Sequence, residues 1–354
     1  MKKYYPILVS KNGETGALQH LEQRVKDGVC PIIEILNPTL VKIKKDKNTG
    51  LEVESYSDKF EIFLKTHWNF FNNQVILDFS MFTDWERHIR FIEQTLLRLL
   101  NSGVNVVPCV QSNSTEIYKR IVTEIVKKYG CSLCFRFSNS SGGFLHMNSE
   151  IKKMISDYSV KVDNVILLAD LGQIQPNNYN TIGSTLGVVL INLSQEIERF
   201  KAVVLASSSF PATLNDFDHR KEPHTLARYE WALFNNIAKD SLAALKYGDY
   251  GTKTANFEDV QYMGSISLKY STDKEYVIYR GLRTIDHPLG HNQFIQHSRE
   301  LVQSSYYSSS NFSWGDFRYS QISLQDLTTG SPGNSTQWVQ YSQNHHITLM
   351  HSIL

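Results

Sequence analysis

The chain has 354 residues, of which 41% are hydrophobic and 20% are charged. Such a chain can bury a sizeable core, so a globally disordered protein is excluded. The 36 lysines and arginines nearly balance the 35 aspartates and glutamates, which leaves a net charge of +1. This balance argues against a general polyanion binder and makes nucleic acid an unlikely partner, while a local basic site is still compatible with it.

The N-terminal residues contain two lysines but no apolar run before Asn12 and Glu14. No stretch approaches the roughly 20 apolar residues of a membrane span, so we expect no signal peptide, no membrane partner and a cytoplasmic location. The four cysteines are Cys30, Cys109, Cys131 and Cys134. One Cys-x-x-Cys pair inside a strand-like run predicts structural cysteines in a reducing compartment, since no second pair completes a zinc site.

Eight short apolar runs rich in β-branched residues recur along the first 250 residues. They are Pro6–Ser10, Pro31–Leu36, Gln74–Phe79, Asn105–Val110, Leu133–Phe137, Asn164–Ala169, Ala202–Ala206 and Leu245–Gly248. Near-continuous apolar runs of this length are typical of parallel strands covered by helices. Amphipathic segments lie between them, for example Glu86–Leu100, Thr115–Lys128 and Thr225–Ile237.

The count of eight strand-and-helix units predicts a TIM-type (β/α)₈ barrel. An open doubly wound α/β sheet is the alternative, which is weakened because no Gly-x-Gly-x-x-Gly follows the first strand. After about residue 255 the composition changes, and Gly264–Gly281 has two β-rich runs around Thr272-Asp273-Lys274, typical of a hairpin. We therefore expect a barrel over residues 1–255 and a β-containing C-terminal extension over residues 256–354, whose aromatic, histidine-rich tail packs on the barrel.

Polar side chains follow the ends of the predicted strands, which is where a barrel carries its chemistry. They are Lys11, Glu14, Glu34, Asp78, Gln111, Arg136, Asp170, Ser207, Ser209 and Asp249. An ionised carboxylate inside an apolar run is costly unless it is paired or faces water. With Lys11 and Arg136 as counter-charges, the set predicts a ligand-binding or catalytic pocket. The ordinary structural alternative is a group of acids that cap helices or pair with arginine.

Two chemistries fit the four strand-end acids that we expect to be catalytic. These acids are Glu34, Asp78, Asp170 and Asp249. They could hold a divalent cation such as Mg²⁺ while Lys11 and Arg136 clamp a phosphate, which is metal-assisted phosphodiester hydrolysis. Alternatively, one carboxyl group is a general acid and another a base, as in glycoside hydrolysis, with no metal needed. A Schiff base on an early lysine is the weakest of the options.

Two further features are candidate ligand-binding elements. The loop Ser207–Pro211 follows the seventh strand, and late barrel loops often bind phosphate, although a solvated loop is the simpler interpretation. Near the end of the chain lie His345 and His346. If they lie on a strand, at most one enters a given pocket, where it could be an acid, a base or a metal ligand. The alternative is a partly buried pair without a chemical role.

The chain contains several short motifs that recur in one known family. They are Tyr4-Tyr5-Pro6, Lys11-x-x-Glu14, Ala17-Leu18, Pro31-Ile32-Ile33-Glu34, Trp314-Gly315-Asp316, Gly333-Asn334, Trp338 and His345-His346. With these motifs the chain resembles the Beta protein family of phages, phage satellites and bacterial defence islands. The resemblance implies an intracellular protein associated with mobile elements and encoded beside defence or toxin genes. It carries over no catalytic residue.

Together these observations favour a component of phage defence or phage–host conflict that binds an anionic, phosphorylated ligand at the strand ends and hydrolyses it if it is an enzyme. A non-catalytic sensor, or a module that neutralises a toxin encoded nearby, is the alternative. A metal-dependent nuclease or phosphodiesterase is a third hypothesis, against which the near-zero net charge counts.

Overall fold

The eight predicted strands form a closed barrel of parallel strands. The computed structural model describes residues 3–68, 73–84, 86–138, 144, 146–193, 197–219, 222–239, 245–256 and 264–354. The barrel strands are β1 (Tyr4–Val9), β2 (Ile32–Glu34), β5 (Gln74–Asp78), β6 (Asn105–Val110), β7 (Leu133–Ser138), β8 (Val165–Gln173), β9 (Ala202–Ser208) and β11 (Leu245–Asp249). Each strand pairs with its neighbour in this order, and β11 closes the barrel on β1. The predicted TIM-type barrel is confirmed, and the open sheet is excluded.

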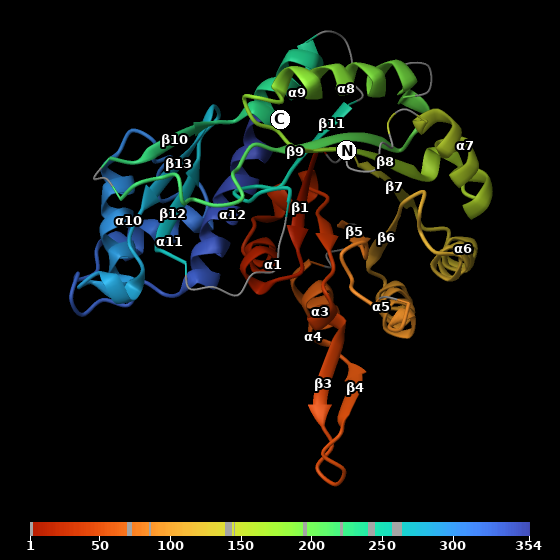
Figure 1. The fold of residues 1–354 in the computed structure, drawn as a ribbon, viewed down its shortest axis with the longest axis horizontal. Coiled ribbons are helices and arrows are strands. Elements are labelled where there is room, and N and C mark those ends of the chain that lie inside the picture. The colour runs from red at the N-terminus through yellow and green to blue at the C-terminus, as the bar shows by residue number, and fades with distance from the viewer. Residues whose placement is uncertain are drawn as a thin grey trace.

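Helices follow the strands and surround the barrel (Figure 1). They are α1 (Asn12–Gln19), α2 (Gln23–Gly28), α3 (Asn37–Leu40), α4 (Lys59–Phe63), α5 (Ile89–Asn101), α6 (Glu116–Tyr129), α7 (Met147–Tyr158), α8 (Tyr179–Leu193) and α9 (Tyr229–Lys239), with short π or 3₁₀ turns at Leu64–Trp68, Val162–Asn164 and Ile197–Arg199. The helices predicted over Glu86–Leu100 and Thr115–Lys128 are confirmed within a few residues. The helix predicted from Thr225 is wrong at its start, because His224–Ala227 form strand β10.

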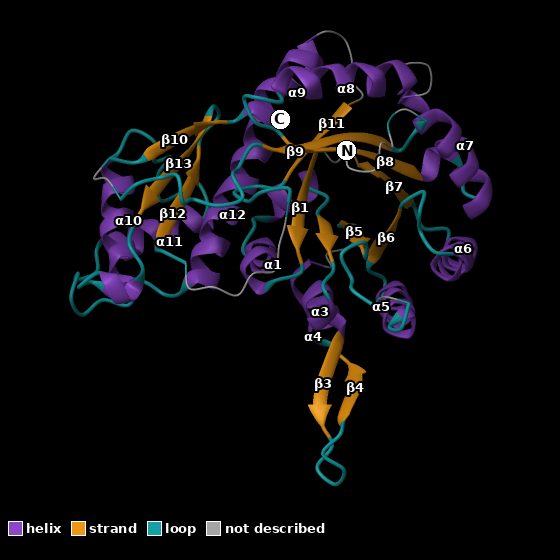
Figure 2. Cartoon of the chain, in the orientation of Figure 1, coloured by secondary structure: helices purple, strands orange, loops and turns teal. Residues whose placement is uncertain are grey.

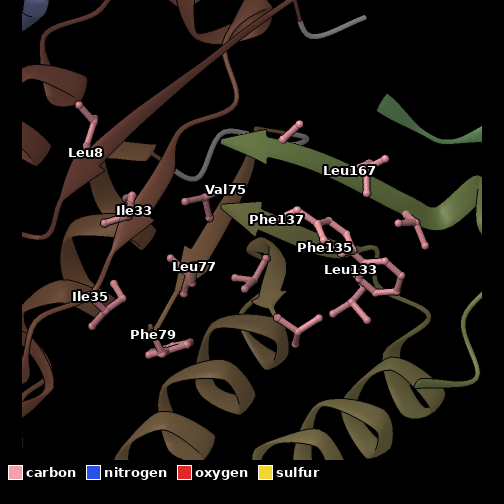
Figure 3. Packing of buried hydrophobic residues seen from close by; sticks show 14 of the residues in the cluster. Leu8, Ile33, Ile35, Val75, Leu77, Phe79, Leu133, Phe135, Phe137 and Leu167 are labelled. Carbon is pink, nitrogen blue, oxygen red and sulfur yellow. The ribbon is translucent and has the colours of Figure 1, made fainter. Parts of the chain in front are cut away.

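Two apolar layers hold the barrel together, because alternate residues of each strand face opposite sides. The inner layer contains Tyr5, Ile7 and Ile76 and fills the interior of the barrel. The outer layer lies between the strands and the helices, and Figure 3 shows part of it, with Leu77 and Phe135 among the packed side chains. This alternation decides which strand-end side chains can meet inside the barrel.

A two-stranded hairpin that the sequence did not predict projects from the barrel between β2 and β5 (Figure 1). It consists of β3 (Val41–Lys45) and β4 (Glu52–Tyr56). Its apolar side chains away from the base are exposed, Ile43 at 60% and Leu51 at 68%, whereas Val41 at the base is buried. Lysine or glutamate alternates with single apolar residues in both strands, which is itself a hairpin pattern, but neither strand has the continuous apolar run that marks the barrel strands.

The remaining elements form the extension beside the barrel (Figure 2). They are β12 (Ser267–Ser271), β13 (Glu275–Arg280), α10 (Gln293–Gln303), α11 (Trp314–Ser323) and α12 (Ser335–Ile353), with 3₁₀ turns at Thr284–Asp286 and Gly290–Asn292. The hairpin predicted around Thr272-Asp273-Lys274 is confirmed as β12–β13. Its sheet takes a third strand, β10, from before residue 255, so the boundary at residue 255 stays a prediction.

Helix α12 connects the extension to the barrel, because it packs against both α1 and β12. Asn334 caps its N-terminus in a reciprocal capping box with Gln337. Within the ranges that the structure describes, no helix is long and apolar enough to cross a membrane.

Candidate functional site

Arg136 lies at the carboxyl-terminal end of the barrel strands, which we call the barrel mouth. Its guanidinium group donates hydrogen bonds to four residues. Its Nη1 atom donates to Glu34 at 2.9 Å and to Asp78 at 2.6 Å. Its Nη2 atom donates to Asp170 at 2.6 Å and to the Tyr250 hydroxyl at 2.9 Å, and its Nε atom reaches Asp170 at 3.2 Å. All five N–H groups of the guanidinium are therefore used. We call these five residues the Arg136 cluster.

The Arg136 cluster is nearly closed to solvent, since none of its four charged side chains is more than 8% exposed. Burial raises the pKa of Glu34, and the opposing charges of Arg136 and Lys253 do not fully offset it. Burial would also raise the pKa of Asp78, but Arg136 and the backbone N–H of Ser80 lower it below its ordinary value. Two neighbouring carboxyl groups thus have pKa values that are displaced in opposite directions.

A second ion pair, between Lys253 and Glu14, lies against the Arg136 cluster. The Lys253 Nζ atom is 3.1 Å from Glu14 and 3.7 Å from Glu34. The loop that carries Lys253 lies across the barrel mouth, because Ser208 Oγ donates to the Lys253 carbonyl at 2.7 Å. With this pair the mouth holds four carboxyl groups and two cations, so it is carboxylate-rich.

Lys253 and Tyr250 are the residues of this site that sequence reasoning missed. Both follow the eighth strand, and Tyr250 is two residues beyond Gly248, so it faces the same side of the strand. Counting alternate residues past the end of each strand would have found Tyr250. Lys253 lies too far along the loop for that count.

Three of the expected ring members point away from the barrel interior, and the expectation that all ten share one ring is wrong for them. Asp249 faces outward, where it accepts from Tyr4 and contacts His346. Ser207 and Ser209 also face outward, and Ser209 donates to Glu230. The physical reason is the strand pleat, since adjacent residues point to opposite faces and Ser208 is the one that faces inward.

Asp249 and His346 form a buried polar contact between the barrel and α12. The His346 Nε2 atom is 2.9 Å from Asp249 Oδ2, and its Nδ1 atom is 2.9 Å from Ser271 Oγ. Burial would raise the pKa of Asp249, but His346, Arg228 and the Tyr4 hydroxyl together lower it to about 2. The order Ser271–His346–Asp249 resembles a nucleophile triad, yet all three are at most 1% exposed, so no substrate reaches the serine.

His345 makes a separate set of contacts on the next position of α12. Its Nδ1 atom is 2.7 Å from Asp316 and its Nε2 atom is 2.8 Å from the Ser271 carbonyl. The two histidines do not lie on a strand, because Ser335–Ile353 is helical, so the argument from strand alternation does not apply to them. Neither histidine reaches the Arg136 cluster. The contacts of His345 lie within the extension, whereas His346 joins the extension to the barrel through Asp249.

Lys11 and Gln111 line two separate hollows at the strand ends. Gln111 and Asp78 both line a cavity of about 150 Å³. Lys11 is exposed and lines a larger hollow of about 500 Å³, which we call the β1–β2 hollow. Its lining includes Ser10, Lys11, Thr39, Lys59, Phe60 and Phe63. Lys253, rather than Lys11, supplies the second cation of the barrel mouth.

The predicted cation site is not formed by the four acids. In the ranges that the structure describes, no group of three histidine, cysteine or acidic side chains is arranged to hold a metal ion. Arg136 occupies the centre where a cation bound by Glu34, Asp78 and Asp170 would lie. Asp249 is not part of the cluster.

Sequence comparison decides the family of this chain. A family model described as Beta protein matches residues 4–352. The chain belongs to the Beta protein family. No curated protein matches this Beta protein family member significantly. Membership is consistent with a phage-related role.

A comparison with solved structures found similarity to a mutant tryptophan synthase alpha-subunit from Pyrococcus furiosus. The identity is 9% and the TM-score 0.39, with 70% of the Beta protein chain and 87% of the other chain covered. The closed barrel of this chain is shown by its own strand order.

Proposed function

We propose that this protein acts in phage–host conflict by binding a small anionic, phosphate-bearing ligand in the β1–β2 hollow. One observation carries the proposal. The hollow of about 500 Å³ opens at the carboxyl ends of β1 and β2, and its described lining contains two lysines, Lys11 and Lys59, and no carboxylate. Ligands of barrel proteins bind at this end of the strands.

The other groups of the β1–β2 hollow suit such a ligand. Asn12 and Thr15 belong to the first turns of α1, whose N-terminal end carries the positive pole of the helix dipole. Hydroxyl groups of Ser10 and Thr39 lie 2.6 Å apart at the edge of the hollow. Phe60 and Phe63 are stacked with ring centroids 6.3 Å apart, and they offer an apolar wall to an organic part of the ligand.

The Arg136 cluster is less suited to the anion, although Arg136 was expected to clamp it. Every N–H group of Arg136 already has a partner, and the surrounding carboxylates would repel a phosphate. The cluster is nevertheless close in the fold, because the Ser10 N–H donates to the Glu34 carbonyl at 2.9 Å. Ser10 thus belongs to the hollow and is bonded to a residue of the cluster.

Acid–base hydrolysis is a second candidate function, and a specific observation favours it. The pKa of Glu34 is raised by burial while that of Asp78 is lowered. Such a pair can provide a protonated acid and an ionised base at the same pH. The double variant Glu34→Gln/Asp78→Asn tests this function. Loss of hydrolytic activity with retained ligand binding would support it, and full hydrolytic activity in a folded double variant would contradict it.

The binding proposal is tested by titration with inorganic pyrophosphate at constant ionic strength. Wild type, Lys11→Met/Lys59→Met and a control with two exposed hairpin lysines replaced, Lys44→Met/Lys47→Met, are compared by calorimetry. The first double variant should weaken binding at the hollow at least 10-fold, and the control should not. Equal affinity of all three proteins for pyrophosphate would contradict the proposal.

The biological role is tested with the same variants in cells challenged with phage. If the bound anion is needed, the Lys11→Met/Lys59→Met variant should lose any effect of the wild type on plaque numbers. Retention of the full effect by a variant that no longer binds pyrophosphate would favour the partner-binding module instead.

A further inference from the structure

A second hollow lies in the extension, between β12 and α12. Its volume is about 390 Å³ and we call it the β12–α12 pocket. Its polar lining is Ser265, Ser267, Lys269, Thr284, His291 and Ser335. Further along α12, Trp338 and Ser342 form its wall. Among the described lining residues there is one ammonium group and no carboxylate.

Lys269 is the charged group of the β12–α12 pocket, and its contacts are weak. Its Nζ atom lies 3.5 Å from the Thr252 carbonyl and 4.7 Å from the centre of the Phe210 ring. No described carboxylate is within salt-bridge distance of it. Burial lowers the pKa of Lys269 to about 8, although the charge of Glu14 opposes this. The Lys269 side chain is partly buried, and among the described residues its ammonium has one long hydrogen bond and no ion pair, which leaves its charge poorly compensated.

The β12–α12 pocket offers other groups that favour negative charge. Ser335 is the first residue of α12, a helix of 19 residues whose positive dipole end therefore lies at the pocket. The hydroxyl groups of Ser267 and Thr284 can donate to an anion. Glu14 is bonded to Lys253 at 3.1 Å, so its charge is already partly neutralised on the barrel side.

We infer that the β12–α12 pocket is a second anion site, which takes a small ligand bearing a phosphate or carboxylate group bound by Lys269. A bound anion would supply the counter-charge that the described residues around the ammonium lack. The site differs from the β1–β2 hollow in every lining residue, so it does not depend on the function proposed for that hollow.

The test is a stoichiometry measurement with inorganic pyrophosphate at constant ionic strength. Lys269→Met should bind one equivalent fewer than the wild type, or bind the affected equivalent at least 10-fold more weakly. Lys274→Met, which removes an exposed lysine from the turn of the same hairpin, should match the wild type. If the β1–β2 hollow binds no pyrophosphate, the wild type should bind one equivalent and Lys269→Met none. The measurement therefore distinguishes failure of the β1–β2 proposal from failure of this one.

A second variant and a chemical probe keep the inference testable if Lys269→Met folds poorly. Ser267→Phe fills the pocket without changing its charge and should also lose one equivalent. Pyridoxal phosphate with borohydride should label Lys269, and pyrophosphate should reduce that labelling at least threefold while labelling of Lys274 stays constant. An unchanged stoichiometry in both folded variants, or labelling of Lys269 that pyrophosphate does not reduce, would overturn the inference.

Discussion

Arg136 and Asp170 share two hydrogen bonds, because both Nε and Nη2 of the guanidinium donate to the same carboxylate oxygen, at 3.2 and 2.6 Å. The Tyr250 hydroxyl donates to that oxygen as well, at 2.6 Å. This oxygen of Asp170 therefore accepts three hydrogen bonds. The arrangement ties β7, β8 and the loop after β11 together through one buried ion pair.

Removal of Arg136 should destabilise the protein strongly. Arg136→Met leaves Glu34, Asp78 and Asp170 buried without their shared cation, which should lower the free energy of unfolding by about 3–5 kcal/mol. Urea denaturation measures the loss. The matched control is Arg283→Met, which breaks an exposed pair with Asp286 and should cost less than about 1 kcal/mol. Equal costs for the two variants would show that the cluster does not stabilise the barrel.

Stability should fall as the pH falls below about 6.5, and His346 is one cause. Burial lowers the pKa of His346, so the unfolded chain takes up a proton that the folded chain excludes. This contribution is complete above the pKa of the unfolded state and is lost as the pH falls through the folded pKa. Asp249, whose pKa is lowered to about 2, loses its contribution only below about pH 4.

The histidine prediction is measured by denaturation between pH 7.5 and pH 5.5. His346→Gln should reduce the pH dependence by up to about 1.4 kcal/mol per pH unit, the limit for one proton. Charged and titrating groups around His346 are Asp249, Arg228 and Glu230, and all three are unchanged in this variant. The exposed His219→Gln serves as the control and should leave the slope as it is. A wild-type slope in His346→Gln would rule out this histidine as a cause.

Two glycine substitutions should change stability in opposite directions. A Cβ atom at Gly315 would overlap the backbone carbonyl of Tyr341, where α11 crosses α12, so Gly315→Ala should cost about 1–3 kcal/mol. Gly187 on α8 has open space around the same position, so Gly187→Ala should stabilise by about 0.5–1 kcal/mol through its higher helix propensity. Thermal unfolding distinguishes the two. A neutral Gly315→Ala would mean that the helix crossing can widen at little cost.

The β3–β4 hairpin should be dispensable for folding. Replacement of residues 44–53 by Asn-Gly keeps the pair Ile43 and Glu54 and closes them with a two-residue turn. Because the removed Leu51 and Val53 are 68% and 49% exposed, the free energy of unfolding should change by less than about 0.5 kcal/mol. A loss above about 2 kcal/mol would show that the hairpin contributes to the barrel core.

Much of the barrel could be predicted from the sequence, because each strand is a local apolar run long enough to stand out from its turns. The sequence also indicated four charged residues of the site, because charged residues inside such apolar runs are rare. They are Glu34, Asp78, Arg136 and Asp170. The β3–β4 hairpin was missed because its charged and apolar residues alternate and form no continuous apolar run. The helix that carries His345 and His346 does have a local signal, the capping box of Asn334 and Gln337, but the burial of both histidines depends on the packing of α12 against other elements.

The hydrophobic content of 41% determined that the chain would form a globular core, and the eight apolar runs determined a barrel with polar residues at its strand ends. Only the tertiary structure decided which of those residues meet. Strand pairing fixes the direction of every side chain, and it turned Asp249, Ser207 and Ser209 outward while it brought Tyr250 inward. The fold of the loop after β11 also placed Lys253 beside Glu14 and Glu34, although it is distant from both in sequence. An ion pair depends on the distance between two charges in space, which the sequence alone does not give.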